Sequence, residues 1–291
     1  MTARSLFLLL LAIPFSLTAC SSDSFATPSD GGPDDSAAVD AAADTLSDVV
    51  APPPDASGSD GQAPDAGWKP PPPLVCASAP AGTIFCADFD ESNDPGAGWS
   101  SIFKLNGDVT LDLTNFYSSA RAARTLANGN PQSYGTLYQN NVDATHTQFA
   151  LSYAFRVEAV DNAATVRVAR FSYPSATTSS NVNFDVVIGP GTGVGLSVST
   201  SAVDGGTTSN SFNLGSYTKG VWHHVVLNVK VKPTPVQIGA SFDGAEQTFS
   251  PNLPPAGGLV NTRDLHMGAQ AETDMASPAT IQIDDVLLRA F

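Results

Sequence analysis

The stretch of sequence that decides the fold is GVWHHVVLNVKVKPTPVQIGASFDG, residues 220–244. Apolar and polar side chains alternate over residues 221–231 with the period of two that a β-strand requires. A second strand is predicted over residues 236–242, and it ends at Asp243-Gly244, which is a turn signal. The first strand should therefore bury one apolar face between two sheets, made of Val225, Leu227, Val229 and Val231.

Short strands of the same kind recur along the chain. The clearest is residues 148–158, whose inward face is predicted to carry Phe149, Leu151, Tyr153, Phe155 and Val157. No segment shows a helical period with caps. The number of strands favours an all-β, two-sheet antiparallel sandwich. The other strands are expected at residues 83–89, 101–105, 109–113, 120–126, 134–139, 165–173, 182–188, 193–200, 209–214, 265–269 and 280–289.

These patterns resemble a known fold family. The glycine, the Trp-His pair, the β-branched run and the strand closing on Asp-Gly are similar to the late core strands of laminin-G-like and concanavalin A-like domains. The resemblance implies a concanavalin A-like jelly-roll domain over residues 74–291. A galactose-binding-type jelly roll is the alternative, although that fold usually needs fewer residues.

Residues 1–20 are predicted to be a targeting segment outside the fold. Arg4 supplies a positive start, and the apolar run at residues 6–17 is too short for a comfortable membrane span. The run closes on Leu17-Thr18-Ala19-Cys20, which resembles the lipobox of bacterial lipoproteins. In that family the cysteine is lipidated, so the resemblance implies a lipid anchor on Cys20. The alternative is an ordinary signal peptide that ends near a cysteine.

The residue after the cysteine is Ser21 and not aspartate, which resembles an outer-membrane sorting signal. The expected location is therefore the cell envelope, at the outer membrane or the cell surface. Residues 21–73 are predicted to be a disordered linker, because Asp, Ala, Pro, Ser and Gly dominate and large apolar residues are almost absent. The linker carries ten aspartates and one lysine, and the whole chain has a net charge of −15, which argues against nucleic acid as a partner.

The three cysteines are assigned to two roles. Cys20 belongs to the predicted anchor, which leaves Cys76 and Cys86 as a pair. A pair of this kind in an exported protein favours a disulfide bond. It would fasten the start of the domain to its first strand.

Catalytic signals are incomplete. Glu272-Thr273-Asp274 resembles part of the alternating acids of glucanases, but the third acid is replaced by Ala276 or Ser277. A loop before the last strand is therefore predicted there. Lyases of this fold use Arg, His and Tyr on the concave sheet, yet no ordered lyase motif is present although the residue types occur. No catalytic residue is predicted, and the sequence favours a protein that is not an enzyme. The arginines and the histidine of these types are Arg156, Arg167, Arg170 and His224.

Acidic residues at the two ends of the domain suggest a metal. Asp88 and Asp90 flank Phe89, and Asp284 lies in the last strand. The pattern resembles jelly-roll carbohydrate-binding modules, in which the first and last strands are neighbours and a structural Ca²⁺ often lies between them. Carboxylate oxygens suit this hard cation. The alternative is that the acids face solvent or accept backbone hydrogen bonds.

The expected function is that of a non-catalytic binding or adhesion module, with a glycan as the ligand. Four polar residues are predicted to share the exposed face of the concave sheet and to form a shallow site there. The alternatives are a divergent glucanase or lyase, and a scaffold protein of the cell envelope. The four predicted ligand-binding residues are Arg156, Asp185, His224 and Asn228.

Overall fold

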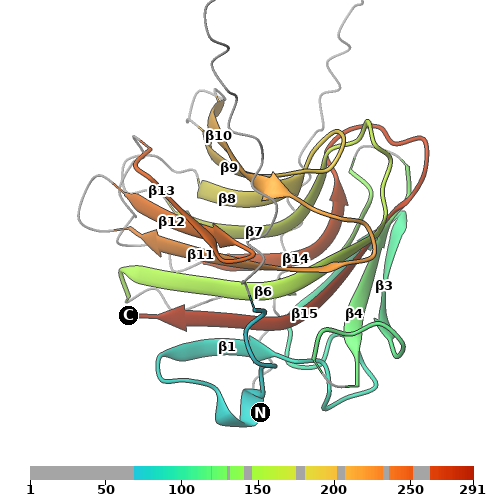
Figure 1. The fold of residues 1–291 in the computed structure, drawn as a ribbon, viewed down its shortest axis with the longest axis horizontal. Helices are drawn as coiled ribbons and strands as arrows, with labels where there is room; N and C mark the ends of the chain where they lie inside the picture. The colour runs from blue at the N-terminus through green and yellow to red at the C-terminus, as the bar shows by residue number, and fades with distance from the viewer. Residues whose placement is uncertain are drawn as a thin grey trace, which may run out of the picture. The chain divides into compact units, whose positions relative to one another are not determined.

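The structure is a computed structural model that describes residues 69–118, 120–129, 132–140, 146–174, 181–201, 207–231, 236–251 and 263–291. Within these residues the chain is nearly all β-structure, in two antiparallel sheets that form a sandwich (Figure 1). The predicted jelly-roll sandwich is therefore confirmed. The predicted anchor and most of the predicted linker lie outside the described residues. None of the described helices is long and apolar enough to cross a membrane.

Sheet A has eight strands. Its long central strands are β6 (Gln148–Ala159) and β15 (Ala279–Ala290), and β1 (Thr83–Ala87) pairs with the second half of β15. The order along the rest of the sheet is β13 (Ala245–Phe249), β12 (Gln237–Phe242), β11 (Trp222–Lys230), β6, β15, β4 (Ala122–Ala127) and β3 (Gly107–Asp112). The first strand thus lies beside the last, as the resemblance implied.

Sheet B has seven strands and lies behind sheet A in Figure 1. Its strands come from both halves of the domain, so residues far apart in sequence meet on its surface. The order is β10 (Thr207–Ser216), β9 (Gly193–Ser201), β8 (Asn181–Ile188), β7 (Val166–Pro174), β14 (Asp264–Ala271), β5 (Tyr134–Gln139) and β2 (Ser101–Leu105).

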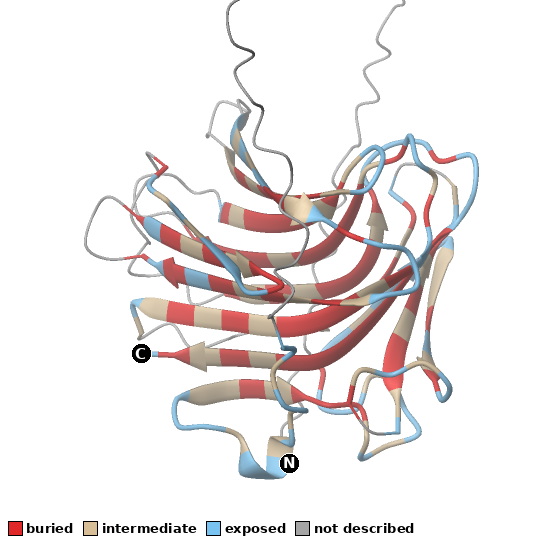
Figure 2. Ribbon diagram, viewed as in Figure 1, coloured by how far each residue is buried: buried red, intermediate tan, exposed pale blue. Residues whose placement is uncertain are grey.

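The core lies between the sheets and follows the predicted alternation. The buried and partly exposed bands alternate along β6 and β11 in Figure 2, and the inward side chains of both strands are almost completely buried. The predicted apolar faces are confirmed, because in a strand every second side chain points to the same side of the sheet. On β6 these side chains are Phe149, Leu151, Tyr153, Phe155 and Val157, and at β11 they are Val225, Leu227, Val229 and Val231.

The predicted turn at Asp243-Gly244 joins β12 to β13. Both residues have positive φ, 47° and 82°, which is the geometry of a two-residue hairpin loop whose twist matches its strands. The Asp243 carboxylate also accepts a hydrogen bond from Nδ1 of buried His223 (2.6 Å) and one from the backbone N–H of His224 (2.8 Å). His223 is therefore a core histidine that fixes this hairpin to β11.

Two glycines let the sheets approach closely beside β5 and β14. A Cβ atom on Gly135 would lie 2.1 Å from the carbonyl oxygen of Asp108, and one on Gly268 would lie 2.5 Å from the carbonyl oxygen of Gly135. Gly268 also has a φ of 132°, which L residues rarely adopt. The missing side chains leave room for the backbone around β5 and β14, the strands that carry Tyr138 and His266.

The disulfide between Cys76 and Cys86 is present, with Cα atoms 5.7 Å apart. It joins the turn η1 (Cys76–Ser78) to β1, as the sequence predicted. A bulge interrupts the pairing of β15 with β6 between Asp284 and Leu287, and Asp285 there has a φ of 52°. The bulge lies between the part of β15 that pairs with β4 and the part that pairs with β1.

Candidate functional site

Polar side chains from four neighbouring strands form one row on the outer face of sheet B. Tyr138 of β5 lies opposite His266 of β14. His266 in turn lies opposite Arg170 of β7, and Arg170 lies opposite Asp185 of β8. Neighbouring strands are about 4.8 Å apart, so side chains that are adjacent in this row are in reach of each other.

Ion pairs hold the centre of the row. Arg170 binds Asp185 through two bonds, from Nε to Oδ1 (2.6 Å) and from Nη2 to Oδ2 (2.8 Å). Nε of Arg167, a nearly buried residue, lies 3.5 Å from the same Oδ1, and its guanidinium also pairs with Glu272. Two arginines and two carboxylates therefore form a charge-balanced group with fixed geometry.

An aromatic group continues the row towards the edge of the sheet. The Tyr138 ring is centred 4.7 Å from the His266 ring and 4.9 Å from the ring of Phe103 on β2. Phe103 is 40% exposed, so one ring of the group is open to solvent. The Tyr138 hydroxyl donates to Oδ1 of Asp264 (3.1 Å), which orients the phenol. A ring beside polar groups is an arrangement that suits a sugar, whose faces are apolar and whose edges carry hydroxyls.

The electrostatics of the row follow from burial and from the two arginines. Burial, with the positive charges of Arg170 and Arg167, lowers the pKa of His266 to about 4. Burial raises the pKa of Asp264 and of Tyr138, and the nearby Asp264 carboxylate raises that of Tyr138 further. His266 is thus a neutral imidazole at neutral pH, able to donate one hydrogen bond and to accept another.

The four predicted ligand-binding residues do not form one site. Arg156 of β6 and both His224 and Asn228 of β11 lie in sheet A, whereas Asp185 lies in sheet B. The prediction that they share a face was wrong for Asp185. Alternation tells which side of its own strand a residue occupies, but it does not tell which sheet the strand joins.

The part of sheet A's outer face around Arg156 is covered by other segments. Arg156 donates to Gln282 Oε1 (2.5 Å) and to the carbonyl oxygen of Gly220 (2.7 Å). The ring of Trp222 lies against that of Tyr117, from the loop after β3, with centroids 5.9 Å apart. His224 is engaged as well, with Nε2 2.9 Å from the Ser152 hydroxyl. The polar groups of this area are bound to one another and to the backbone. The outer face of sheet B is therefore the better candidate for a binding surface.

Two of the predicted metal residues accept hydrogen bonds from the backbone. Asp284 is buried and accepts from the backbone N–H groups of Tyr117 and Ser118, and Asp88 accepts from that of Cys76. Burial raises the pKa of Asp284 to about 8, and the negative charge of Asp285 raises it as well. In the described part of the chain no three His, Cys, Asp or Glu side chains are placed to hold a metal ion. This geometry matches the hydrogen-bonding alternative, and calcium binding stays a prediction, which thermal unfolding with and without EDTA tests.

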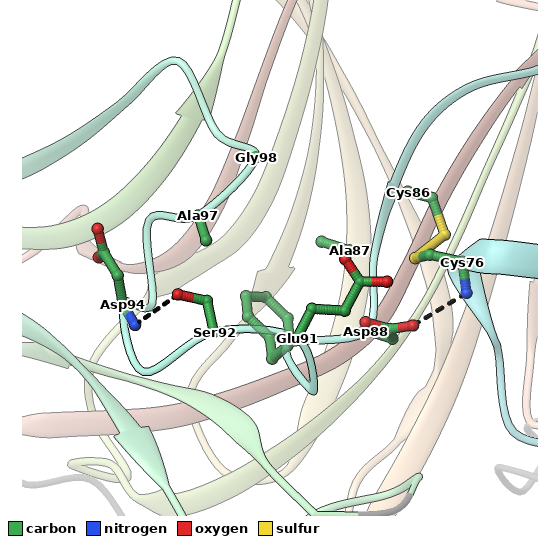
Figure 3. A pocket seen from close by; sticks show the side chains of 10 residues that line it. Cys76, Cys86, Ala87, Asp88, Glu91, Ser92, Asp94, Ala97 and Gly98 are labelled. Carbon is green, nitrogen blue, oxygen red and sulfur yellow. Dashed lines mark hydrogen bonds between the residues drawn. A yellow bond between two sulfur atoms is a disulfide. The ribbon is translucent and has the colours of Figure 1, made fainter.

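A small pocket lies beside the disulfide (Figure 3). It is lined by Cys76, Cys86 and the loop after β1, and the side chains of Asp88 and Glu91 point towards each other there. Asp90 belongs to the same loop. Its negative charge and that of Asp88 reach Asp285, whose pKa is raised mainly by burial. The pocket holds acids and the disulfide but no aromatic platform, so it is a weaker candidate for a glycan than sheet B.

The acidic motif at residues 272–274 lies in the turn between β14 and β15, as predicted. Glu272 pairs with Arg167, and the Thr273 hydroxyl accepts from the backbone N–H of Thr165 (3.0 Å). This places Glu272 at the border of the sheet B row.

Sequence reasoning missed Phe103, Tyr138 and His266. Tyr138 and His266 stand on the more polar side of a short predicted strand, and that was the available signal, whereas residues 101–105 show no clear polar side that would have marked Phe103. The order of the strands, which brings β2, β5, β14, β7 and β8 side by side, cannot be read from the alternation.

No protein-family model and no curated protein matches this sequence. Solved structures do share its fold. The endo-β-1,4-glucuronan lyase from the fungus Trichoderma reesei is 17% identical, with 72% of this chain and 96% of that chain covered and a TM-score of 0.52. The PL-14 alginate lyase from Aplysia kurodai is 11% identical, with 72% and 100% covered and a TM-score of 0.54. The cellulose-induced protein Cip1 is 13% identical, with 71% and 97% covered and a TM-score of 0.51. At these identities the likeness shows the fold alone.

Proposed function

We propose that this domain binds a polysaccharide on the outer face of sheet B, without cleaving it. The binding surface, called the sheet B cluster below, consists of Phe103, Tyr138, Arg167, Arg170, Asp185 and His266. The observation that carries the proposal is that an aromatic group with one exposed ring, Phe103, lies in the same row of one sheet face as a fixed ionic group. The rings offer stacking area, and the polar groups give orientation through hydrogen bonds to hydroxyls.

The comparisons support a carbohydrate as the ligand in a general way. Two of the structures with the same fold are named as lyases of glucuronan and alginate, and the third is named as a cellulose-induced protein. A shared fold does not fix a function, so the ligand class rests on the residues of the sheet B cluster.

Cleavage by β-elimination is the second candidate, and one observation favours it. Tyr138 and a neutral His266 are adjacent, and such a pair can exchange protons with a substrate. Against it, two N–H donors of Arg170 are bound to Asp185, and Arg167 is nearly buried between two carboxylates. A lyase needs a cation that is available to neutralise the carboxylate of its substrate. The balanced ion pairs favour binding over cleavage.

A glycan array probed with the full chain tests the proposal, with two variants matched in exposure. Phe103→Ala removes the open ring of the sheet B cluster, while Phe116→Ala removes a ring that is 39% exposed in the loop after β3. We expect Phe103→Ala to weaken binding by about tenfold, since lost stacking costs about 1–1.5 kcal/mol. Phe116→Ala should leave glycan binding unchanged.

Three outcomes would contradict the binding proposal. Equal glycan binding by Phe103→Ala and Phe116→Ala would show that the binding site is not the sheet B cluster. Release of unsaturated sugars that stops in Tyr138→Phe would show a lyase. Absence of any glycan ligand would favour the envelope scaffold that the sequence also allowed.

We also propose that the domain is held at the bacterial cell envelope by a lipid on Cys20. The support is the sequence resemblance of residues 17–20 to a lipobox, followed by an acidic linker rich in Pro, Ala and Asp. A glycan-binding domain on a long linker would then display the sheet B cluster at the cell surface.

A further inference from the structure

Several large exposed apolar side chains lie on the segments that cover sheet A. Four of those in the described residues are Val75 (54% exposed), Leu113 (64%), Phe116 (39%) and Val221 (46%). They lie before η1, in the loop after β3 and next to the start of β11. Phe103 and Leu105 are on β2 in sheet B, and Phe291 follows β15. Scattered exposed apolar residues are ordinary, whereas a group of them marks an interaction surface.

Hydrogen bonds and a ring contact join the segments that carry these four residues. The backbone N–H of Leu74, next to Val75, donates to Oδ2 of Asp285 (2.9 Å). The hydroxyl of Ser118 donates to Oδ1 of the same carboxylate (2.6 Å). The ring of Tyr117, in the loop after β3, also lies against the ring of Trp222, which follows Val221 in sequence. The segments that carry the four exposed apolar side chains are therefore joined to one another, and we call these four side chains the sheet A patch: Val75, Leu113, Phe116 and Val221.

The same surface receives the N-terminal end of the described chain. The Tyr117 hydroxyl donates to the carbonyl oxygen of Pro71 (3.2 Å), and Leu74 is held by Asp285. Residues 69–75 thus lie on the sheet A side, and the remaining chain towards Cys20 continues from there. If Cys20 carries a lipid, the membrane attachment is connected to the domain at this patch.

The chemistry of the patch suits the surface of a lipid bilayer. Residues 113–118 read LTNFYS and carry no charge, and Tyr117 and Trp222 lie among the apolar side chains. Tyr and Trp are enriched where proteins meet the membrane–water interface, since their rings combine an apolar body with a polar tip. Within residues 113–118 no charged group resists this contact, and the guanidinium of Arg121, later in the same loop, donates to the carbonyl oxygen of Ser92.

We propose that the sheet A patch rests on the lipid surface to which the chain is anchored. The outer faces of the two sheets of a sandwich point in opposite directions, so this contact turns the sheet B cluster away from the membrane. The inference goes beyond glycan binding, because it assigns a second surface and a different partner. It uses the proposed lipid anchor to choose the partner, but the patch can be tested without the anchor.

The test uses residues 21–291, which lack Cys20 and retain every residue that the structure describes. The protein is sedimented with phosphatidylcholine vesicles, chosen because the chain has a net charge of −15 and anionic lipid would repel it. We expect measurable binding that changes little with salt. The double variant Leu113→Ser/Phe116→Ser should bind about tenfold less, since each side chain loses its apolar contact with lipid.

The matched control is Phe103→Ser/Leu105→Ser, which removes two side chains of similar exposure, 40% and 45%, from the other sheet. This control should bind vesicles like the unchanged chain. No binding by the unchanged chain, or an equal loss in both variants, would overturn the proposal. Self-association that the Leu113/Phe116 variant abolishes, without vesicle binding, would assign the patch to a second copy and also overturn it. A negative vesicle result does not change the glycan array result or the labelling of Cys20. The proposals of glycan binding, of the lipid anchor and of the sheet A patch can therefore be refuted independently.

Discussion

His266 has properties that its neighbours impose on it. A free histidine titrates near pH 6.5, but burial and the charges of Arg170 and Arg167 keep this imidazole neutral down to about pH 4. Its ring is held against Tyr138, which is in turn oriented by Asp264. A neutral, oriented imidazole can both donate and accept a hydrogen bond at any pH well above 4.

The shift of His266 predicts a pH dependence of stability. Between about pH 6.5 and about pH 4 the unfolded chain binds a proton at this residue while the folded chain does not. The contribution of His266 to the free energy of unfolding is therefore complete above about pH 6.5 and is lost as the pH falls towards 4. Asp264 and Asp284, whose pKa values are raised, act in the opposite direction.

The comparison that isolates this effect is between the unchanged chain and His266→Gln. Urea unfolding at pH 7 and pH 5 should show a smaller loss of stability on acidification in the variant. A titration of the His266 ring by NMR gives its pKa directly, and a value near 6.5 would contradict the argument.

At the scale of elements, β15 connects the two ends of the domain. It pairs with β6 along one edge and with β4 and then β1 along the other, and its bulge places Asp284 and Asp285 where they bind the loop after β3 and residues 69–75. The disulfide fixes the start of the domain, at Cys76, to β1. The covering of sheet A therefore depends on the last strand and on the disulfide together.

Removing the disulfide should destabilise this end of the domain. The closed loop is short, with a sequence separation of 10, so Cys76→Ala/Cys86→Ala should lower the free energy of unfolding by about 2–3 kcal/mol on the chain-entropy model. Urea unfolding of the variant and of the oxidised chain measures the difference. Two free thiols in native material, found by mass spectrometry, would show that the bond does not form.

At the scale of the whole molecule, the two outer faces have different surfaces. Sheet B carries the sheet B cluster, which is ionic and aromatic, whereas sheet A is covered by the segments that bear the sheet A patch. A protein that is anchored on one side and binds a ligand on the other needs this division, because one surface cannot face both partners.

The anchor is tested in the full chain by Cys20→Ser. Metabolic labelling with a palmitate analogue should mark the unchanged protein and not the variant, and the variant should be released from the membrane fraction. A useful control is Cys76→Ser, which changes a cysteine that the structure assigns to the disulfide and should keep the label. Unchanged labelling of Cys20→Ser would remove the anchor from the proposal.

The sequence by itself determined most of the strands, the inward faces and the disulfide, although β13 (Ala245–Phe249) was not predicted. Residues 148–158 and 221–231 alternate so regularly that only one face of each can be buried, and the structure buries the side chains expected for residues 225–231 and for the whole inward face of β6. Cys76 and Cys86 were the two cysteines left in the domain, and they are bonded. The alternation is a local property of each strand, and the disulfide follows from the number of cysteines in the domain. Neither prediction needs the order of the strands in the sheets.

The tertiary structure alone decided which strands are neighbours, and with that the candidate site. Arg156 and Asp185 each stand opposite the apolar side of a predicted strand, so the sequence does not tell them apart. In the structure Arg156 donates to Gln282 on sheet A, whereas Asp185 accepts from Arg170 on sheet B. Tyr138, Arg170 and His266 meet because β14 inserts between β5 and β7, although β14 is far from both in sequence. The hydrogen bonds that join strands are made by the backbone, which is the same for every residue except proline, so side-chain alternation carries no record of the partner strand.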